Sequence, residues 1–77
     1  MAGLPQKLGA NVRQARSERD WTQEELSART NLAVVQISRI ERGRREVRLS
    51  TLIRLIDALD IPPEVLLRGL YKRSIGD

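Results

Sequence analysis

Two short helix signals joined by a turn occupy residues 22–43, and they constrain the fold more than any other stretch. Thr22 is a favourable N-cap residue, and Glu25, three positions later, completes a capping box. Asn31 follows the first helix and enters the left-handed region at modest cost, which predicts a turn. A second helix is expected over about residues 33–42, with Gly43 closing it. The chain should therefore contain two short helices held at a tight turn.

The charge of the chain is concentrated at the end of the second helix. The net charge is +4, from 14 Lys and Arg against 10 Asp and Glu. Five arginines fall within ten residues, namely Arg39, Arg42, Arg44, Arg45 and Arg48. A helix pair with a basic exposed face is typical of a DNA-binding helix-turn-helix, although capped helical hairpins are also common in other all-α domains.

Apolar residues at helical spacing predict three further helices. One helix is expected from about residue 5 to 19, one after Ser50 as its N-cap, and one beginning at the proline pair 62–63. Their apolar positions are Leu8, Val12 and Ala15, then Leu52, Leu55, Ile56 and Leu59, then Val65, Leu66, Leu67 and Leu70. We expect an all-α fold, a compact five-helix bundle forming one domain over residues 1–77, with residues 1–4 and 72–77 frayed.

The composition argues against catalysis and metal binding. The chain has no cysteine and no histidine, which removes disulfides, thiolate metal sites and the commonest general base. Its five glycines are scattered rather than grouped in a phosphate-binding loop. No apolar run is long enough for a signal peptide or a membrane span. We expect a cytoplasmic protein that is not an enzyme and uses no cofactor, metal or small-molecule ligand.

The runs TQEELSARTNL and ISRIERGRR resemble the phage Cro and repressor type of helix-turn-helix protein. The resemblance covers about residues 5–70, and its most specific parts are the Thr-Gln-x-Glu-Leu start and the Ile-Ser-x-Ile-Glu-x-Gly end. It implies a lambda-repressor-like fold in which the second and third helices form the helix-turn-helix. Restriction-modification controller proteins belong to the same family, and the short chain favours a small stand-alone regulator of that kind.

The resemblance also implies roles for particular side chains. An arginine at the position of Arg16 pairs in this family with the glutamate at the position of Glu41, which needs a partner if it is buried. The glutamine matching Gln23 lies against the DNA backbone, at a helix start whose free amides attract phosphate. We expect phosphate contacts from Thr22, Gln23, Arg42, Arg44, Arg45 and Arg48, the alternative being a solvated charge run.

The third helix departs from the family pattern because its first turn is apolar, with Ala33, Val34 and Val35 where polar residues usually meet the bases. The two valines either pack on thymine methyl groups, meet a protein partner, or leave Val35 alone exposed while Val34 leans into the core. Arg39 faces the same way as Val35 and is the candidate for a guanine contact. The expected base-contacting residues are Val34, Val35, Gln36, Ser38 and Arg39.

The last helix has more apolar residues than one packed face needs. In the resembling family, dimers commonly form through the last helices, which places two reading helices about 34 Å apart, one DNA turn. We expect Val65, Leu67 and Leu70 at a homodimer interface, the alternative being that Leu66 and Leu70 only complete the monomer core.

The sequence thus favours a sequence-specific transcriptional regulator that binds a symmetric operator in double-stranded DNA as a homodimer. The alternative is a protein-interaction adaptor that uses the valine-bearing surface and the apolar last helix as its contact surface.

Overall fold

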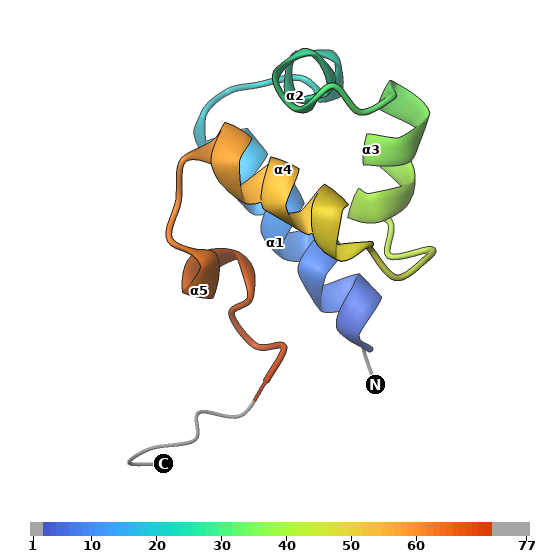
Figure 1. The fold of residues 1–77 in the computed structure, drawn as a ribbon, viewed down its shortest axis with the longest axis vertical. Helices are drawn as coiled ribbons and strands as arrows, with labels where there is room; N and C mark the ends of the chain where they lie inside the picture. Colours follow the sequence, from blue (N-terminus) through green and yellow to red (C-terminus); the bar gives the residue numbers. More distant parts are fainter. Residues whose placement is uncertain (1–2, 72–77) are drawn as a thin grey trace.

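The computed structural model describes residues 3–71, and within them all regular structure is helical (Figure 1). The expectation of frayed ends at residues 1–2 and 72–77 lies outside the described residues. The helices are α1 (Leu4–Glu18), α2 (Gln23–Thr30), α3 (Val34–Glu41), α4 (Leu49–Leu59) and α5 (Pro63–Leu66). The expected five-helix, all-α fold is confirmed.

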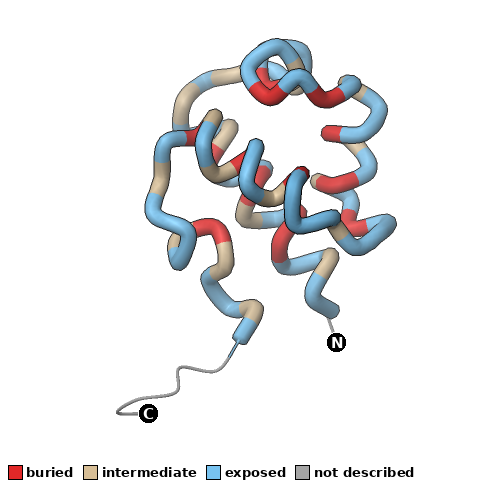
Figure 2. The backbone as a smooth tube through the Cα atoms, in the orientation of Figure 1, coloured by how far each residue is buried: buried red, intermediate tan, exposed pale blue. Residues whose placement is uncertain are grey.

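The helices surround one small core. α1 contacts α3, α4 and α5, while α2 packs between α3 and α4. Figure 1 shows α2 and α3 together at one end of the molecule and α5 at the opposite side of α1. Every helix contributes at least one apolar side chain to the core, and buried residues recur along α1, α3 and α4 (Figure 2). The core residues are Leu8, Val12, Ala15, Leu26, Leu32, Ile37, Ile40, Leu55, Leu59 and Leu66.

The turn between α2 and α3 has the expected local structure. The Glu25 amide donates to Thr22 Oγ1 at 3.0 Å, and the Thr22 amide donates to Glu25 Oε1 at 2.9 Å. Asn31 ends α2 in the left-handed region with φ of 60°. Ala33 occupies the N-cap of α3 with no side-chain hydrogen bond, as expected for a residue that lacks a polar side chain.

Three expected helix boundaries are wrong. α1 begins at Leu4, so this residue belongs to a helix instead of a frayed end. α4 begins at Leu49 with Arg48 as its N-cap residue, which puts Ser50 inside the first turn. α5 is a single turn that ends at Leu66, so Leu67 and Leu70 follow the helix and do not lie on it. Apolar spacing alone does not mark these ends, since they depend on where the backbone packs.

Two glycines allow α1 to lie against the end of α3. A β-carbon at Gly9 would lie 2.8 Å from the Glu41 carbonyl oxygen and closer still to that of Ile40. Gly43 has φ of 66° and closes α3 in the left-handed region, as predicted. A β-carbon there would lie 2.6 Å from Gln6 Cα. The backbone of α1 therefore lies in close contact with the end of α3.

Side chains from α1 also bind the ends of α4 and α5. Arg19 donates from its two terminal nitrogens to the carbonyls of Ala15 and Leu59, each at 2.7 Å. Asn11 Nδ2 donates to the carbonyls of Leu66 and Arg68, each at 2.8 Å. The carbonyls of Ala15, Leu59 and Leu66 lie in the last turns of their helices, where they have no helical partner, and that of Arg68 lies in the segment after α5. α1 is thus the helix against which α3, α4 and α5 pack.

Candidate nucleic-acid interface

A cluster of polar side chains fixes the end of α3 against α1 and α2. Arg16 Nε donates to Glu41 Oε2 at 2.7 Å, and a second guanidinium nitrogen donates to Glu41 Oε1 at 2.9 Å. The remaining terminal nitrogen of Arg16 donates to the Trp21 carbonyl at 2.7 Å. The side chains of Arg16 and Glu41 are 14% and 3% exposed. The hydrogen bonds and the charge of Glu41 raise the pKa of Arg16 above its ordinary value, although burial opposes this.

Gln23 joins the same cluster. Its Nε2 donates to Glu41 Oε1 at 3.1 Å, which ties the first residue of α2 to the last residue of α3. The ion pair expected between Arg16 and Glu41 is present, with two parallel hydrogen bonds. The role of Gln23 inside the protein was not predicted, because sequence spacing does not show that the starts and ends of two helices meet. The cluster holds α3 at a defined angle to α2.

The side chains expected to contact bases do not all lie on one surface of α3. Val35, Gln36 and Arg39 are exposed, and Val35 retains 55% of its surface. Val34 and Ser38 are half-buried. Residues 35 and 39 are one turn apart and share a face, whereas residues 34 and 38 lie about 100° further around the helix axis. The structure therefore brings together three of the five.

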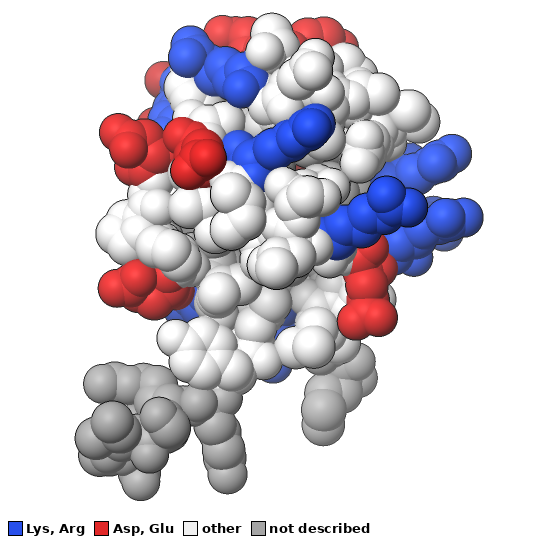
Figure 3. All heavy atoms as spheres, in the orientation of Figure 1, with Lys and Arg blue, Asp and Glu red and all other residues white. Residues whose placement is uncertain are grey.

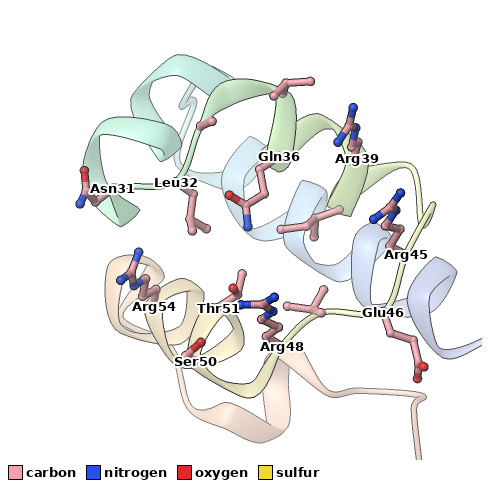
Figure 4. A pocket seen from close by; sticks show the side chains of 14 residues that line it. Asn31, Leu32, Gln36, Arg39, Arg45, Glu46, Arg48, Ser50, Thr51 and Arg54 are labelled. Carbon is pink, nitrogen blue, oxygen red and sulfur yellow. The ribbon is translucent and has the colours of Figure 1, made fainter.

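A cleft of about 590 Å³ lies between this face of α3 and the segment from the loop after α3 to the start of α4 (Figure 4). Val35, Gln36 and Arg39 line one wall, and Arg45 and Arg48 from the loop line the other. Figure 3 shows Lys and Arg side chains gathered at the edge that carries the end of α3 and the following loop. Most acidic side chains visible in that view lie elsewhere. The cleft therefore lies on the side of the molecule where basic side chains gather.

The other residues expected to bind phosphate lie outside the cleft. Arg42 and Arg44 are exposed, and Arg42 Nε donates to the Ser38 carbonyl of its own helix at 3.4 Å. The Thr22 hydroxyl accepts the capping hydrogen bond of α2, and the Gln23 amide is bound to Glu41. Their contacts with DNA remain predictions.

Three cleft residues were missed by sequence reasoning, namely Ser50, Thr51 and Arg54. The sequence indicates only that they lie at the N-cap and in the first turn of a helix whose apolar positions form the core. The available signal was an arginine one turn after a Ser-Thr pair at a helix start. This pattern indicates a binding surface only because the start of α4 lies across the cleft from α3, which the sequence does not show.

The residues expected at a dimer interface are less exposed than predicted. Val65, Leu67 and Leu70 are half-buried, and the two leucines pack against the core. The first turns of α4 are more exposed, with Leu49 at 72% and Ile53 at 48%. These two residues are one helical turn apart and share a face.

Two short helices joined by a tight turn, with the second beside a basic cleft and three further helices packed around them, define the helix-turn-helix class. The sequence profile of the helix-turn-helix family HTH_3 matches residues 12–66. The chain belongs to this family.

Relatives and solved structures agree with the assignment. The chain is 34% identical over 70 residues to an uncharacterized HTH-type transcriptional regulator of Mycobacterium tuberculosis, covering 91% of this chain and 25% of that protein. It thus spans about a quarter of the length of such relatives. The HTH-type transcriptional regulator y4dJ of Sinorhizobium fredii, also uncharacterized, is 39% identical over 54 residues, 70% of each chain.

Two solved structures have the same fold. The restriction-modification controller protein C.AhdI from Aeromonas hydrophila is 34% identical with a TM-score of 0.77, covering 80% of this chain and 94% of that one. The clp gene regulator ClgR from Corynebacterium glutamicum is 30% identical with a TM-score of 0.82, covering 87% of each chain. None of the helices within residues 3–71 has the length and apolar character needed to cross a membrane.

Proposed function

We propose that this chain is a sequence-specific transcriptional regulator that binds double-stranded DNA with α3 in the major groove. The observation that carries the proposal is the exposed face of Val35, Gln36 and Arg39 beside the basic cleft. The HTH-type transcriptional regulators among its relatives and the fold of the controller protein C.AhdI support it. A regulator of this kind acts on the chromosome, so the proposal includes a cytoplasmic location.

Each part of the surface has a separate task in this proposal. Arg39 donates two hydrogen bonds to a guanine, Gln36 contacts an adjacent base, and Val35 packs against a thymine methyl group. Val34 and Ser38, at the half-buried edge of α3, make peripheral contacts. Phosphate contacts come from Thr22, Gln23, Arg42, Arg44, Arg45 and Arg48, and they position α3 without reading sequence.

The proposed DNA-bound form is a homodimer on a symmetric operator. Two apolar surfaces support this part of the proposal. One is the half-buried segment with Val65, Leu67 and Leu70, whose two leucines also pack against the core. The other is the α4 face with Leu49 and Ile53, which are exposed large apolar residues. In the proposed dimer a two-fold axis relates the two α3 helices, which contact one face of the DNA in successive major grooves.

Selection from a pool of random duplex DNA at about 0.15 M salt, followed by sequencing, tests the proposal. The expected result is enrichment of a two-fold symmetric motif. The Arg39→Ala variant should bind the same motif with one base position relaxed in each half-site, because only that contact has been removed. Failure of the wild-type chain to enrich any motif would refute the proposal.

A protein-interaction adaptor is the second candidate, and the exposed apolar residues Val35, Leu49 and Ile53 favour it. The two functions differ in their response to salt. DNA binding weakens steeply as salt rises because counterions are released from phosphates, whereas apolar protein contacts are much less sensitive. Salt-insensitive binding of a protein, together with no selective binding of DNA, would establish the adaptor.

A further inference from the structure

We propose that Gln6 is a positioning residue for DNA binding, because it fixes the loop that carries three exposed arginines. This loop consists of residues 44–48 and is called the arginine loop, after Arg44, Arg45 and Arg48. The role of Gln6 rests on the proposed function. It gives the start of α1 a part in DNA binding that lies outside the helix-turn-helix.

The side-chain amide of Gln6, in the first turn of α1, joins two glycines. Its Nε2 donates to the Gly43 carbonyl at 3.2 Å, and its Oε1 accepts from the Gly3 amide at 2.9 Å. Gly3 is the N-cap residue of α1, and Gly43 closes α3 directly before the arginine loop. Figure 1 shows the loop after α3 beside the start of α1. One side chain therefore ties the start of α1 to the start of the arginine loop.

The backbone at Gly43 is held tightly. The Gly43 amide donates to the Ile40 carbonyl at 3.0 Å. The Arg44 amide donates to the Arg39 carbonyl at 3.1 Å, which completes the Schellman pattern that closes a helix with a left-handed residue. Gly43 is buried, and a β-carbon on it would lie 2.6 Å from Gln6 Cα. The carbonyl of Gly43 is the remaining polar group of this turn, and Gln6 is its donor.

Beyond Gly43 the arginine loop has few attachments. Among the described residues, the backbone amides from position 45 to position 48 donate to no other backbone group. Within residues 3–71, Gln6 supplies the one side-chain hydrogen bond to the backbone of residues 43–48. Val47 is half-buried and packs against the core. Between α3 and α4 the loop is therefore attached at two points, by the Gln6 bond at its start and by Val47 near its end.

The attachment matters for binding because the loop carries cleft residues. Arg45 and Arg48 line the cleft beside α3. Their guanidinium groups can bind phosphates together only when the loop adopts one conformation, and each residue that is ordered on binding costs conformational entropy. By fixing the loop in the free protein, the Gln6 bond reduces this cost. Gln6 thus acts through the arginines and needs no contact with DNA of its own.

NMR relaxation of the backbone amides in the free protein tests the attachment without DNA. Gln6→Met removes both hydrogen bonds and keeps the length of the side chain. The order parameters of amides 44–48 should fall from the rigid range, about 0.85, toward about 0.6. Gln6→Glu keeps the acceptor for the Gly3 amide but has no donor for the Gly43 carbonyl, so it should loosen the loop equally. A loop that stays ordered in Gln6→Glu would overturn the role of the Gly43 bond.

Fluorescence anisotropy with the duplex selected by the wild-type chain tests the effect on binding. Gln6→Met should weaken binding by a factor of roughly five to ten. The preferred motif and the slope of log affinity against log salt should stay unchanged, because the same phosphate contacts form at a greater entropic cost. Gln14→Met is the matched control, since Gln14 is an exposed residue of the same helix that bonds only to Glu18, and it should bind as wild type does.

A double-mutant cycle tests whether Gln6 acts through the arginines. When Arg45 and Arg48 are both replaced by Gln, the further change Gln6→Met should alter affinity by less than about twofold, because the groups that it positions are absent. An undiminished loss in that background would show that Gln6 contacts DNA itself or supports the whole fold, and it would overturn the positioning role.

The outcomes distinguish the role of Gln6 from the function on which it rests. A wild-type chain that selects a motif, with Gln6→Met binding that motif as tightly as wild type, would overturn the role of Gln6 and leave the regulator proposal standing. A chain that selects no duplex would overturn both.

Discussion

Arg16 and Glu41 form an ion pair with two hydrogen bonds, which joins the last turn of α1 to the last residue of α3. The pair is largely removed from solvent, and Gln23 and the Trp21 carbonyl satisfy further hydrogen-bonding groups around it. Because α3 is short, one firm attachment at its end determines the direction in which its exposed face points. The ion pair is thus a positioning device for the surface that we propose to read DNA.

Arg16→Ala should destabilise the protein by about 3 kcal/mol, because it leaves the Glu41 carboxylate buried without its partner. The melting temperature measured by circular dichroism should fall by roughly 10 °C or more. Arg13→Ala, at an exposed position of the same helix, is the control and should change it little. An unchanged melting temperature for Arg16→Ala would show that the pair is only a surface contact.

The stabilisation by this pair should be insensitive to pH over the usual range. Glu41 raises the pKa of Arg16, so the contribution of Arg16 is fully present below the ordinary arginine pKa and is lost only as pH rises through the higher folded-state value. A difference in stability between wild type and Arg16→Ala that disappears between pH 7 and 9 would contradict this.

Gly9→Ala should destabilise the protein by about 2 kcal/mol or more, since the added methyl group would meet the carbonyl oxygens of Ile40 and Glu41. These are backbone atoms, and they cannot move aside as the end of a flexible side chain would. Urea denaturation gives the free energy of unfolding. Gly69→Ala is an informative comparison, because a β-carbon there has no atom within 4 Å and only its positive φ opposes the change.

Replacing Arg45 and Arg48 together by Gln should weaken binding to every duplex by a similar factor and leave the preferred motif unchanged. The slope of log affinity against log salt should decrease by about 0.9 for each phosphate contact that is lost. Replacing Arg42 and Arg44, which lie outside the cleft, tests whether exposed arginines beyond it contribute equally. A change in the preferred motif with Arg45 and Arg48 replaced would show that one of them contacts a base.

Ile53→Glu should convert a dimer into a monomer, because it places a charge on the exposed apolar face of α4. Sedimentation equilibrium at micromolar concentration measures the mass. Val35→Glu, at a similarly exposed apolar position, should abolish DNA binding by repelling phosphates while leaving the mass unchanged. A dimer that persists in Ile53→Glu would place the interface on the surface with Val65, Leu67 and Leu70 alone.

Local signals predicted the turn between α2 and α3 correctly because their physical causes are local. The capping box of Thr22 and Glu25 and the left-handed turn at Asn31 depend on residues within a few positions of one another. The Arg16 and Glu41 pair is predicted by a family resemblance and not by a local signal, since nothing local connects residues 25 positions apart. Ser50 is a favourable N-cap residue and predicts the start of α4 at that position, but the N-cap is Arg48, two residues earlier.

The sequence by itself determined the helix count, the turn between α2 and α3, and the concentration of arginine after α3. All of these follow from periodicity, capping and composition. Only the tertiary structure decided that Gln23 binds Glu41, that Gly9 permits α1 to touch the end of α3, and that Thr51 and Arg54 face the exposed side of α3. The reason is physical: these relationships join groups on different helices, and their distances depend on how five helices pack around one core.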